Sequence, residues 1–282
     1  MKKKVFSVIL CAALLLSMTG LLATAADRPQ YLVLGDSIAY GSGLSNPREA
    51  VYGRIVADTN GYDYQNYAVP GHTTGNLLRR MVEETVRAAI SDADIISISI
   101  GGNNFLLGNI NSLLYDGLVK EDYSRFDTLG EGFYTDLETI VATIRALNPG
   151  AAIILQTLYN PQTGYVGEVY QHGSDKINDM LRAYDAAHPG EILLADVAAA
   201  LTDSGNDFAE DRIHPSAAGN EKIARVLLET LAENGLGSET EPVITTPGQD
   251  ARGAGIFTVF VNLYGWFFHL LSVIRGILPG VK

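Results

Sequence analysis

Short apolar runs alternate with segments of helical spacing along most of this chain. Runs typical of strands occur at 31–37, 62–69, 94–104, 151–161 and 191–201, and helical patterns at 48–59, 73–92, 136–150, 174–190 and 216–235. Strand alternating with helix predicts a parallel sheet whose two faces are both covered by helices. The sequence therefore predicts an α/β protein. In such sheets ligands bind beyond the carboxyl ends of the strands, which is where candidate functional residues are sought.

The first 26 residues have the layout of a secretory signal peptide. A basic start at Lys2–Lys4 precedes an apolar run, which ends in small residues at 23–26. We expect cleavage after Ala25 or Ala26 and an exported protein, extracellular or in the cell envelope; the alternative is an uncleaved N-terminal membrane helix. Cys11, the single cysteine, lies in this segment, so the mature chain would have no disulfide and no thiolate metal ligand.

Composition excludes some classes of partner. Apolar residues make up 47% of the chain, which is enough for a large core. The formal net charge is −12, and no basic stripe is visible. A chain this acidic is repelled by nucleic acid, so we expect no nucleic-acid partner.

The C-terminal part of the chain differs from the rest. Residues 235–255, rich in Gly, Pro, Thr, Ser and acids, are predicted to form a flexible linker after a domain spanning 27–234. Residues 256–282 form an apolar segment, and 256–274 carry no formal charge, a length that spans a bilayer.

On a helix, the small and polar residues of this segment share one narrow stripe. They are Thr258, Asn262, Gly265, His269, Ser272 and Gly276. One interpretation is a membrane-spanning anchor whose stripe packs against another helix. The other is a helix that docks on the domain or lies at the membrane interface. The length of the uncharged run favours membrane anchoring.

A candidate nucleophile and base lie far apart in the sequence. Ser37 follows the first strand in a turn bordered by glycine. A serine hydroxyl is a weak nucleophile that needs a base within hydrogen-bond reach, and the base needs an orienting partner. The stretch "DRIHPSAAG" places Asp211 three residues before His214, a spacing that brings its carboxylate to the imidazole. For each feature taken alone, ordinary helix capping is the better interpretation, with Asp211 or Ser216 as the cap.

Two further residues suit an acyl-transfer site, which needs donors for the oxyanion. Asn103 follows two glycines at a strand end, and Gly71 permits close backbone approach at another. Each is also an ordinary turn residue when taken singly. Their joint occurrence with Ser37 and the Asp211/His214 pair, each at a loop edge, favours catalysis over coincidence.

The stretches "GDSIAYGSG", "NYAVPGHTT", "IGGNN" and "DRIHPSAAG" together resemble the four blocks of the SGNH (GDSL-type) hydrolase family over about residues 29–234. The resemblance implies a three-layer α/β/α sandwich with a parallel, flavodoxin-like sheet. It also implies a serine esterase or lipase that uses no metal and no cofactor. Residue by residue, it implies Ser37 as nucleophile, His214 as base and Asp211 as orienting acid. The oxyanion donors would be the Ser37 amide, Gly71 and Asn103.

One position departs from the family pattern. The family often has Asp after the third-block Asn, and Asn104 stands there in this chain. Residues 105–133 and 160–173 are expected to shape the substrate pocket. The first is either a cover over an acyl chain or an extra helix on the sheet, and the second is a Gly-rich loop carrying tyrosines. Lipid acyl esters and O-acetylated glycans both remain as substrate classes, and a catalytically idle binding module tethered to the envelope is the alternative function.

Overall fold

Five parallel strands form the central sheet of the protein. The computed structural model describes residues 28–253 and 255–277, so the predicted signal peptide lies outside the described residues. The strands are β1 (Gln30–Gly35), β2 (Asp63–Asn66), β3 (Ile95–Ser99), β4 (Ala152–Gln156) and β5 (Leu193–Ala195). Their order is β2-β1-β3-β4-β5, and every neighbouring pair is parallel. This is the flavodoxin-like order, with its switch point between β1 and β3.

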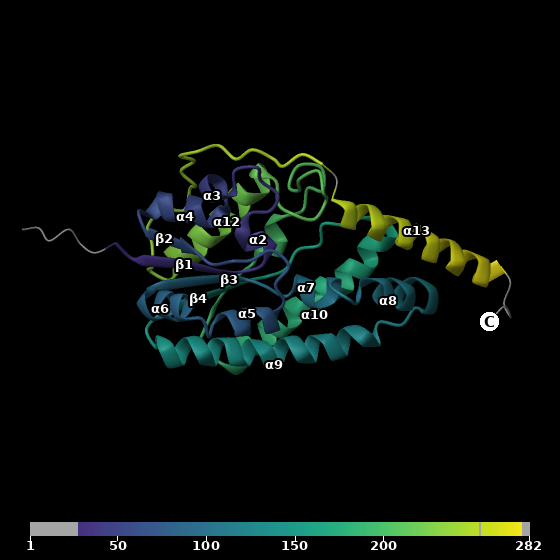
Figure 1. Ribbon diagram of the computed structural model, residues 1–282, viewed down its shortest axis with the longest axis horizontal. Helices are drawn as coiled ribbons and strands as arrows, with labels where there is room; N and C mark the ends of the chain where they lie inside the picture. The colour runs from purple at the N-terminus through teal and green to yellow at the C-terminus, as the bar shows by residue number, and fades with distance from the viewer. Residues whose placement is uncertain (1–27, 254, 278–282) are drawn as a thin grey trace, which may run out of the picture.

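Helices cover both faces of this sheet, and Figure 1 shows the resulting three layers. One layer contains α2 (Ser37–Tyr40), α4 (Tyr52–Asn60), α11 (Val197–Ala200) and α12 (Ala217–Glu233), with α3 (Pro47–Ala50) leading into α4. The other contains α5 (Thr74–Arg80), α6 (Glu84–Asp92), α9 (Ser124–Leu147) and α10 (Gly164–Ala187). The predicted α/β fold and three-layer arrangement are confirmed.

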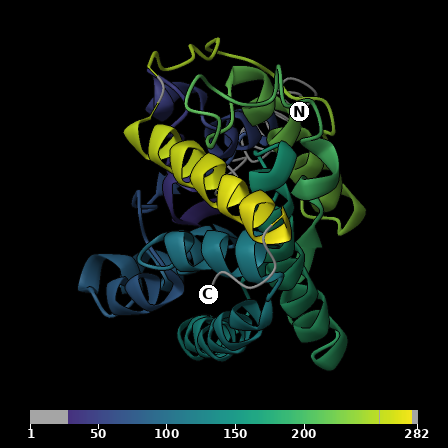
Figure 2. The same cartoon turned by 90° about the vertical axis from the view of Figure 1, so that its right-hand side faces the viewer.

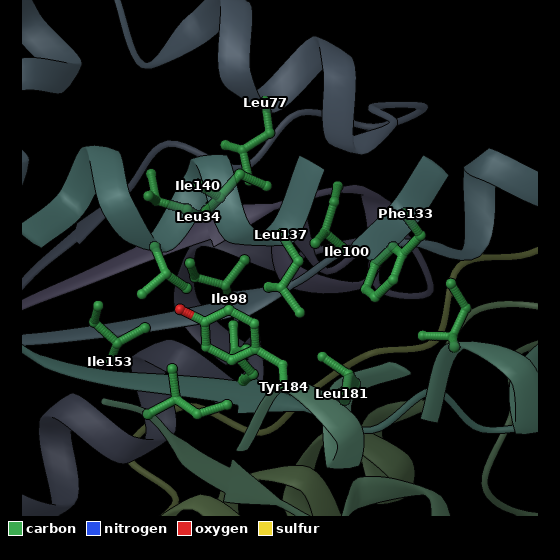
Figure 3. Close-up of a cluster of buried hydrophobic side chains, with 14 of the residues drawn as sticks. Leu34, Leu77, Ile98, Ile100, Phe133, Leu137, Ile140, Ile153, Leu181 and Tyr184 are labelled. Atoms are coloured by element: carbon green, nitrogen blue, oxygen red, sulfur yellow. The ribbon is translucent and has the colours of Figure 1, made fainter. Parts of the chain in front are cut away.

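The core lies in two apolar clusters, one on each face of the sheet. All five residues of β3 are buried, because a strand covered on both faces has no solvent side. In Figure 3, Leu34 and Ile98 from the sheet meet Leu137 of α9 and Leu181 of α10. The apolar faces of α9 and α10 therefore form part of the core on this side of the sheet.

Local structure departs from the sequence expectation in several places. The run at 94–104 is a strand only as far as Ser99 and a helix begins at Gly102, the helix predicted at 48–59 is divided at Val51, and the run at 191–201 is helical over Val197–Ala200. The helix predicted at 73–92 is two helices, because the chain turns after Arg80, which donates to the Tyr67 carbonyl, and α6 begins only at Glu84. The stretch 160–173 is not a Gly-rich loop. Helix α10 begins at Gly164, so Tyr165 and Tyr170 lie on a helix.

Residues 102–123 form a helical insert between β3 and α9. It consists of α7 (Gly102–Leu106), α8 (Ile110–Tyr115) and the π-helical turn η1 (Asp116–Lys120). Phe105, Leu113 and Leu114 are buried in the core cluster of that face. The expected extra helices are therefore present in 105–133. They also line a pocket, as expected for a cover over an acyl chain.

The segment that follows α12 runs along the domain surface toward the site. Between 235 and 253 it forms no helix, but Gln249 accepts a hydrogen bond from the Ser45 amide and the Ala251 amide donates to the Gly43 carbonyl. Its flexibility stays a prediction. The chain then enters α13 (Ile256–Ile277), which packs on α8, η1 and α10 (Figures 1 and 2). Within α13, residues Thr258–Gly276 are long and apolar enough to cross a membrane, judged by length and composition.

Candidate active site

Ser37 lies at the carboxyl end of β1, where the sheet order switches. Gly35 has φ +135°, and a Cβ there would lie 2.1 Å from the Ser99 carbonyl oxygen, so only glycine fits this turn. Asp36 caps α2, because its Oδ1 accepts a hydrogen bond from the Ile38 amide at 3.0 Å. Capping, the alternative role considered for Ser37, is therefore performed by its neighbour. The Ser37 side chain instead faces a pocket.

Asp211 and His214 form a hydrogen-bonded pair. The His214 Nδ1 lies 2.6 Å from Asp211 Oδ2, while Asp211 Oδ1 accepts from the amides of Ile213 and His214, both at 3.0 Å. Burial pushes the pKa of Asp211 up, but the hydrogen bonds from His214 and these amides prevail and hold that pKa below its usual value. The ionised carboxylate thus holds the proton on Nδ1, which leaves Nε2 as the acceptor nitrogen of His214.

The loop that carries this pair is tied to the fold by its backbone. Three successive carbonyls each accept a hydrogen bond from a side chain distant in sequence: Asp211 from Thr258, Arg212 from Gln162 and Ile213 from Tyr159. Sequence reasoning missed these three donors. In each contact the donor and the backbone carbonyl are more than forty residues apart, and no sequence pattern predicts a contact between such residues.

Gly71 lies in the loop after β2 and Asn103 follows β3, and both line the same pocket as Ser37. Gly71 has φ +81°, a conformation that favours glycine, and a Cβ there would meet no atom within 4 Å. Asn103 is on α7, and its Nδ2 donates to the His72 carbonyl at 3.0 Å. Because an amide group carries two N–H donors, this bond fixes the orientation of Asn103 and leaves one donor for another partner.

The pocket brings together most of the predicted residues. Ser37, Gly71, Asn103 and His214 line a cavity of about 360 Å³, and Asp211 lies behind His214. Most of the remaining lining is apolar and comes from the helical insert, α9 and α10: Phe105, Leu106, Leu107, Ile110, Leu113, Phe126 and Val169. Between the described side chains of Ser37 and His214 there is no direct hydrogen bond. Such bonds are often long in free enzymes and tighten only with substrate.

Residues 33–222 match the sequence model of the GDSL-like lipase/acylhydrolase family. The chain belongs to this family. The resemblance drawn from the four sequence blocks is thereby confirmed, and the matched range includes the strand-end turn at Ser37 and the loop with Asp211 and His214.

Relatives and solved structures agree with membership of the GDSL-like family. The chain is 26% identical over 267 residues to the uncharacterized protein YpmR of Bacillus subtilis, covering 85% of this chain and all of that protein. Its fold is similar to that of the lipase Lip_vut3 from a goat rumen metagenome (TM-score 0.59, 22% identity, 75% of this chain and 99% of the other). It is also similar to phospholipase A1 from Streptomyces albidoflavus (0.59, 19%, 72% and 99%) and the acetylxylan esterase Axe2 from Geobacillus stearothermophilus (0.51, 19%, 77% and 97%). At these identities the likeness to solved structures shows the fold.

Asn104, the departure from the GDSL family pattern, supports the start of α5. Its Oδ1 accepts from the Thr74 amide at 3.1 Å and its Nδ2 donates to Thr74 Oγ1 at 2.7 Å. Thr74 Oγ1 in turn donates to Asp136. An aspartate at 104 would have no N–H to donate to Thr74. Because the Asn104 amide is the donor to Thr74 Oγ1, the hydroxyl proton of Thr74 is left for the Asp136 carboxylate.

No metal centre is assembled among the residues that the structure describes. Across 28–253 and 255–277, no three His, Cys, Asp or Glu side chains are grouped so that they could hold a metal ion. The chemistry that the arrangement offers is that of a hydroxyl, an imidazole, a carboxylate and amide donors.

Proposed function

We propose that this member of the GDSL-like family is an exported serine ester hydrolase whose catalytic domain spans residues 27–234. The observation that carries the proposal is the convergence of four separate segments on one apolar pocket. They bring a hydroxyl at Ser37, an imidazole at His214 bonded to Asp211, and amide donors at Gly71 and Asn103. Each group matches a role in acyl transfer that the family motif assigns to its position.

In the proposed mechanism, His214 Nε2 takes the proton of Ser37 as Oγ attacks the ester carbonyl carbon. Asp211 keeps the proton on Nδ1 and stabilises the imidazolium that forms. The amides of Ser37 and Gly71 and the Nδ2 of Asn103 hold the oxyanion. When the tetrahedral intermediate collapses, His214 gives its proton to the leaving alcohol. Water, deprotonated by the same nitrogen, then attacks the acyl-enzyme, and as this second intermediate collapses His214 returns the proton to Ser37 Oγ and the acid is released.

The pocket favours an acyl chain longer than acetyl. Most of its lining beyond Ser37 is apolar, from side chains such as Phe105, Leu113 and Phe126, which offer no hydrogen bond to a sugar hydroxyl; Tyr170 and Ser174 are among the few polar side chains there. A cavity of about 360 Å³ is within the roughly 300–1,000 Å³ of ligand pockets. Lipid acyl esters are therefore the substrate class we favour over O-acetylated glycans.

A panel of p-nitrophenyl esters of increasing acyl length, with acetylated xylan added, tests both parts of the proposal. We expect turnover to rise from acetate to medium-chain esters and to be lost in Ser37→Ala. Ser42→Ala is the matched control, since Ser42 also lines the pocket and the proposed mechanism gives it no role. Equal turnover by Ser37→Ala and the wild type would overturn the mechanism, and a preference for acetylated xylan would overturn the substrate class.

A catalytically idle binding module is the second candidate, favoured by the lack of a direct hydrogen bond between Ser37 and His214. A fluorophosphonate probe separates the two candidates. Labelling that is lost in Ser37→Ala but kept in Ser42→Ala identifies an activated serine. An unlabelled protein that retains its circular dichroism spectrum supports the binding module.

The proposed export is tested at the N-terminus. We expect the secreted or envelope form to begin after Ala25 or Ala26, because small residues at 23–26 suit signal peptidase. Mass determination of the N-terminal peptide checks this, and a mature chain that still begins at Met1 would contradict it.

A further inference from the structure

Helix α13 is docked on the domain along its length, through part of its small and polar stripe and through the apolar Val261 and Phe268. At its start, Thr258 donates to the Asp211 carbonyl. In its middle, Gly265 lies so close to Val166 that a Cβ would be 2.2 Å from that side chain. Farther along, the His269 ring stacks on Tyr165. Near its end, Arg275 Nη1 donates to the Val119 carbonyl at 3.1 Å. Three residues of the stripe, Thr258, Gly265 and His269, are therefore in contact with this chain's own domain.

The opposite face of α13 is apolar and exposed. Nine of the fourteen exposed large hydrophobic side chains found in the described part of the chain lie on this one helix. They are Val259, Phe260, Leu263, Tyr264, Trp266, Phe267, Leu270, Val273 and Ile274, each 40–58% exposed. Figure 2 shows the helix, in yellow, crossing the front of the molecule. Soluble domains rarely expose a continuous apolar surface, so this face is suited to an apolar partner.

Charge indicates which partner. The chain carries a net charge of −12, yet no Asp or Glu follows Asp250. Arg252 and Arg275 flank the apolar face and are exposed, and Lys282 follows. If this face met the same face of a second copy, the arginines would approach one another with no acidic residue of α13 to pair with them. An anionic lipid surface suits this pattern, because cations beside an apolar helix face bind its headgroups while Trp and Tyr occupy the headgroup boundary.

We propose that α13 lies in the plane of a lipid bilayer with its exposed face inserted, while its contacts with the domain stay in place. A spanning orientation would require the contacts of Thr258, Gly265, His269 and Arg275 to break. It would also transfer Thr258 and His269 from their partners Asp211 and Tyr165 into hydrocarbon, where unsatisfied polar groups are costly. The in-plane arrangement keeps every docked contact and buries the apolar side chains.

This arrangement holds the pocket at the lipid surface. The segments that α13 contacts also line the pocket, through Ile110 and Leu113 of α8 and Val169 of α10, and Thr258 is bonded to the loop that carries His214. An acyl chain leaving the bilayer would have a short path to Ser37. This consequence for the substrate rests on the proposed function, whereas the lipid contact of α13 does not.

The chain has a built-in probe for the test, because Trp266 is its single tryptophan and lies near the middle of α13. The full chain is mixed with vesicles of phosphatidylcholine and phosphatidylglycerol, with bromine on the acyl chains either near the headgroup or near the bilayer centre. An in-plane helix lies about 5–10 Å into the headgroup boundary, so we expect a blue-shifted Trp266 emission quenched most by the shallow bromines. A spanning helix would place Trp266 near the midplane, about 15 Å deep, and the deep bromines would quench most.

Variants on the exposed face complete the design. Phe260→Glu and Phe267→Glu should each lower vesicle partitioning, followed through Trp266, by roughly tenfold or more, since each loses the burial of a large apolar side chain. Val82→Glu is the matched control, because Val82 is 70% exposed and lies on the turn between α5 and α6. It should bind vesicles like the wild type.

Three outcomes overturn the proposal: no spectral shift with vesicles by a folded protein, strongest quenching by the deep bromines, or a lipid-independent blue shift with a doubled mass in light scattering. The last would mean that a second copy covers the face. Hydrolysis of a soluble short ester, measured in parallel, should be equal in Phe267→Glu and the wild type. Vesicle binding should persist in Ser37→Ala, so the failure of either proposal is seen separately.

Discussion

Gly43 lies directly against the backbone of Pro215, the residue that follows His214. A Cβ on Gly43 would be 2.0 Å from the Pro215 carbonyl oxygen and 3.1 Å from the His214 Cβ. This contact joins the turn that begins at Ser37 to the loop that carries His214. The separation of the proposed nucleophile and base therefore depends on a position that has no side chain.

We expect Gly43→Ala to lower kcat for ester hydrolysis and to lower the free energy of unfolding by about 1–3 kcal/mol. The added methyl forces the Pro215 backbone away, as in other overpacked sites. Gly132→Ala is the control: it lies within α9, and a Cβ there meets nothing within 4 Å. Replacing that helical glycine should raise stability by about 0.5–1 kcal/mol. Urea denaturation and steady-state kinetics check both, and a fully active Gly43→Ala would contradict the packing argument.

Asn103→Ala tests the proposed oxyanion donor. We expect kcat to fall by about 10²–10³-fold with a smaller change in KM, because the amide acts on charge that develops in the transition state. Asn109→Ala is a matched control that removes a similar bond, from Nδ2 to the Asn104 carbonyl at 3.1 Å, outside the pocket lining. It should keep most of kcat. If the two variants lost equal activity, the effect would be structural and the role of Asn103 would be wrong.

Restoring the common family residue with Asn104→Asp should destabilise this chain by about 1–3 kcal/mol. The new carboxylate cannot donate to Thr74 Oγ1, and two carboxylates would compete for the single Thr74 hydroxyl proton. Adding Asp136→Asn should recover stability, since an amide at 136 can donate to Thr74. Free energies of unfolding for the two single variants and the double variant measure this coupling, and strictly additive losses would refute it.

Asp36 gives a specific pH dependence of stability. Burial raises the pKa of Asp36 to about 7, whereas the pKa of an aspartate in an unfolded chain is about 3.9. Between these values the folded chain holds a proton that the unfolded chain has lost. The contribution of Asp36 to stability is therefore full at low pH and is lost as pH rises toward 7.

We expect the free energy of unfolding of the wild type, minus that of Asp36→Asn, to fall steadily between about pH 4 and pH 7. The amide can still accept the Ile38 hydrogen bond that caps α2, so the helix start is preserved. Urea denaturation across this range measures the difference, in which the titration of other carboxylates cancels. A difference that is flat, or that rises with pH, would contradict a protonated Asp36.

Much of the fold could be predicted because its signals are local. Mainly apolar runs followed by or ending in glycine mark β1 and β3, since a strand buried on both faces is predominantly apolar and its turn needs a left-handed or tight backbone. The errors were also local in origin. Tyr165 and Tyr170 were assigned to a loop because Gly164 and Gly167 lower helix propensity, but Gly167 lies so close to the Gln162 carbonyl that packing requires a glycine there.

For the site, the sequence alone determined the residue types and the family, because each of the four family blocks is a short continuous stretch that can be recognised without the rest of the fold. It also determined that the stripe of α13 shares one face, which follows from helical periodicity. Only the tertiary structure decided what that face meets, since periodicity orders residues around an axis and says nothing of the partner. The contact of Gly265 with Val166 and the bond from Thr258 to Asp211 join segments far apart in the chain, and such contacts exist only once the sheet and its helices have brought those segments together.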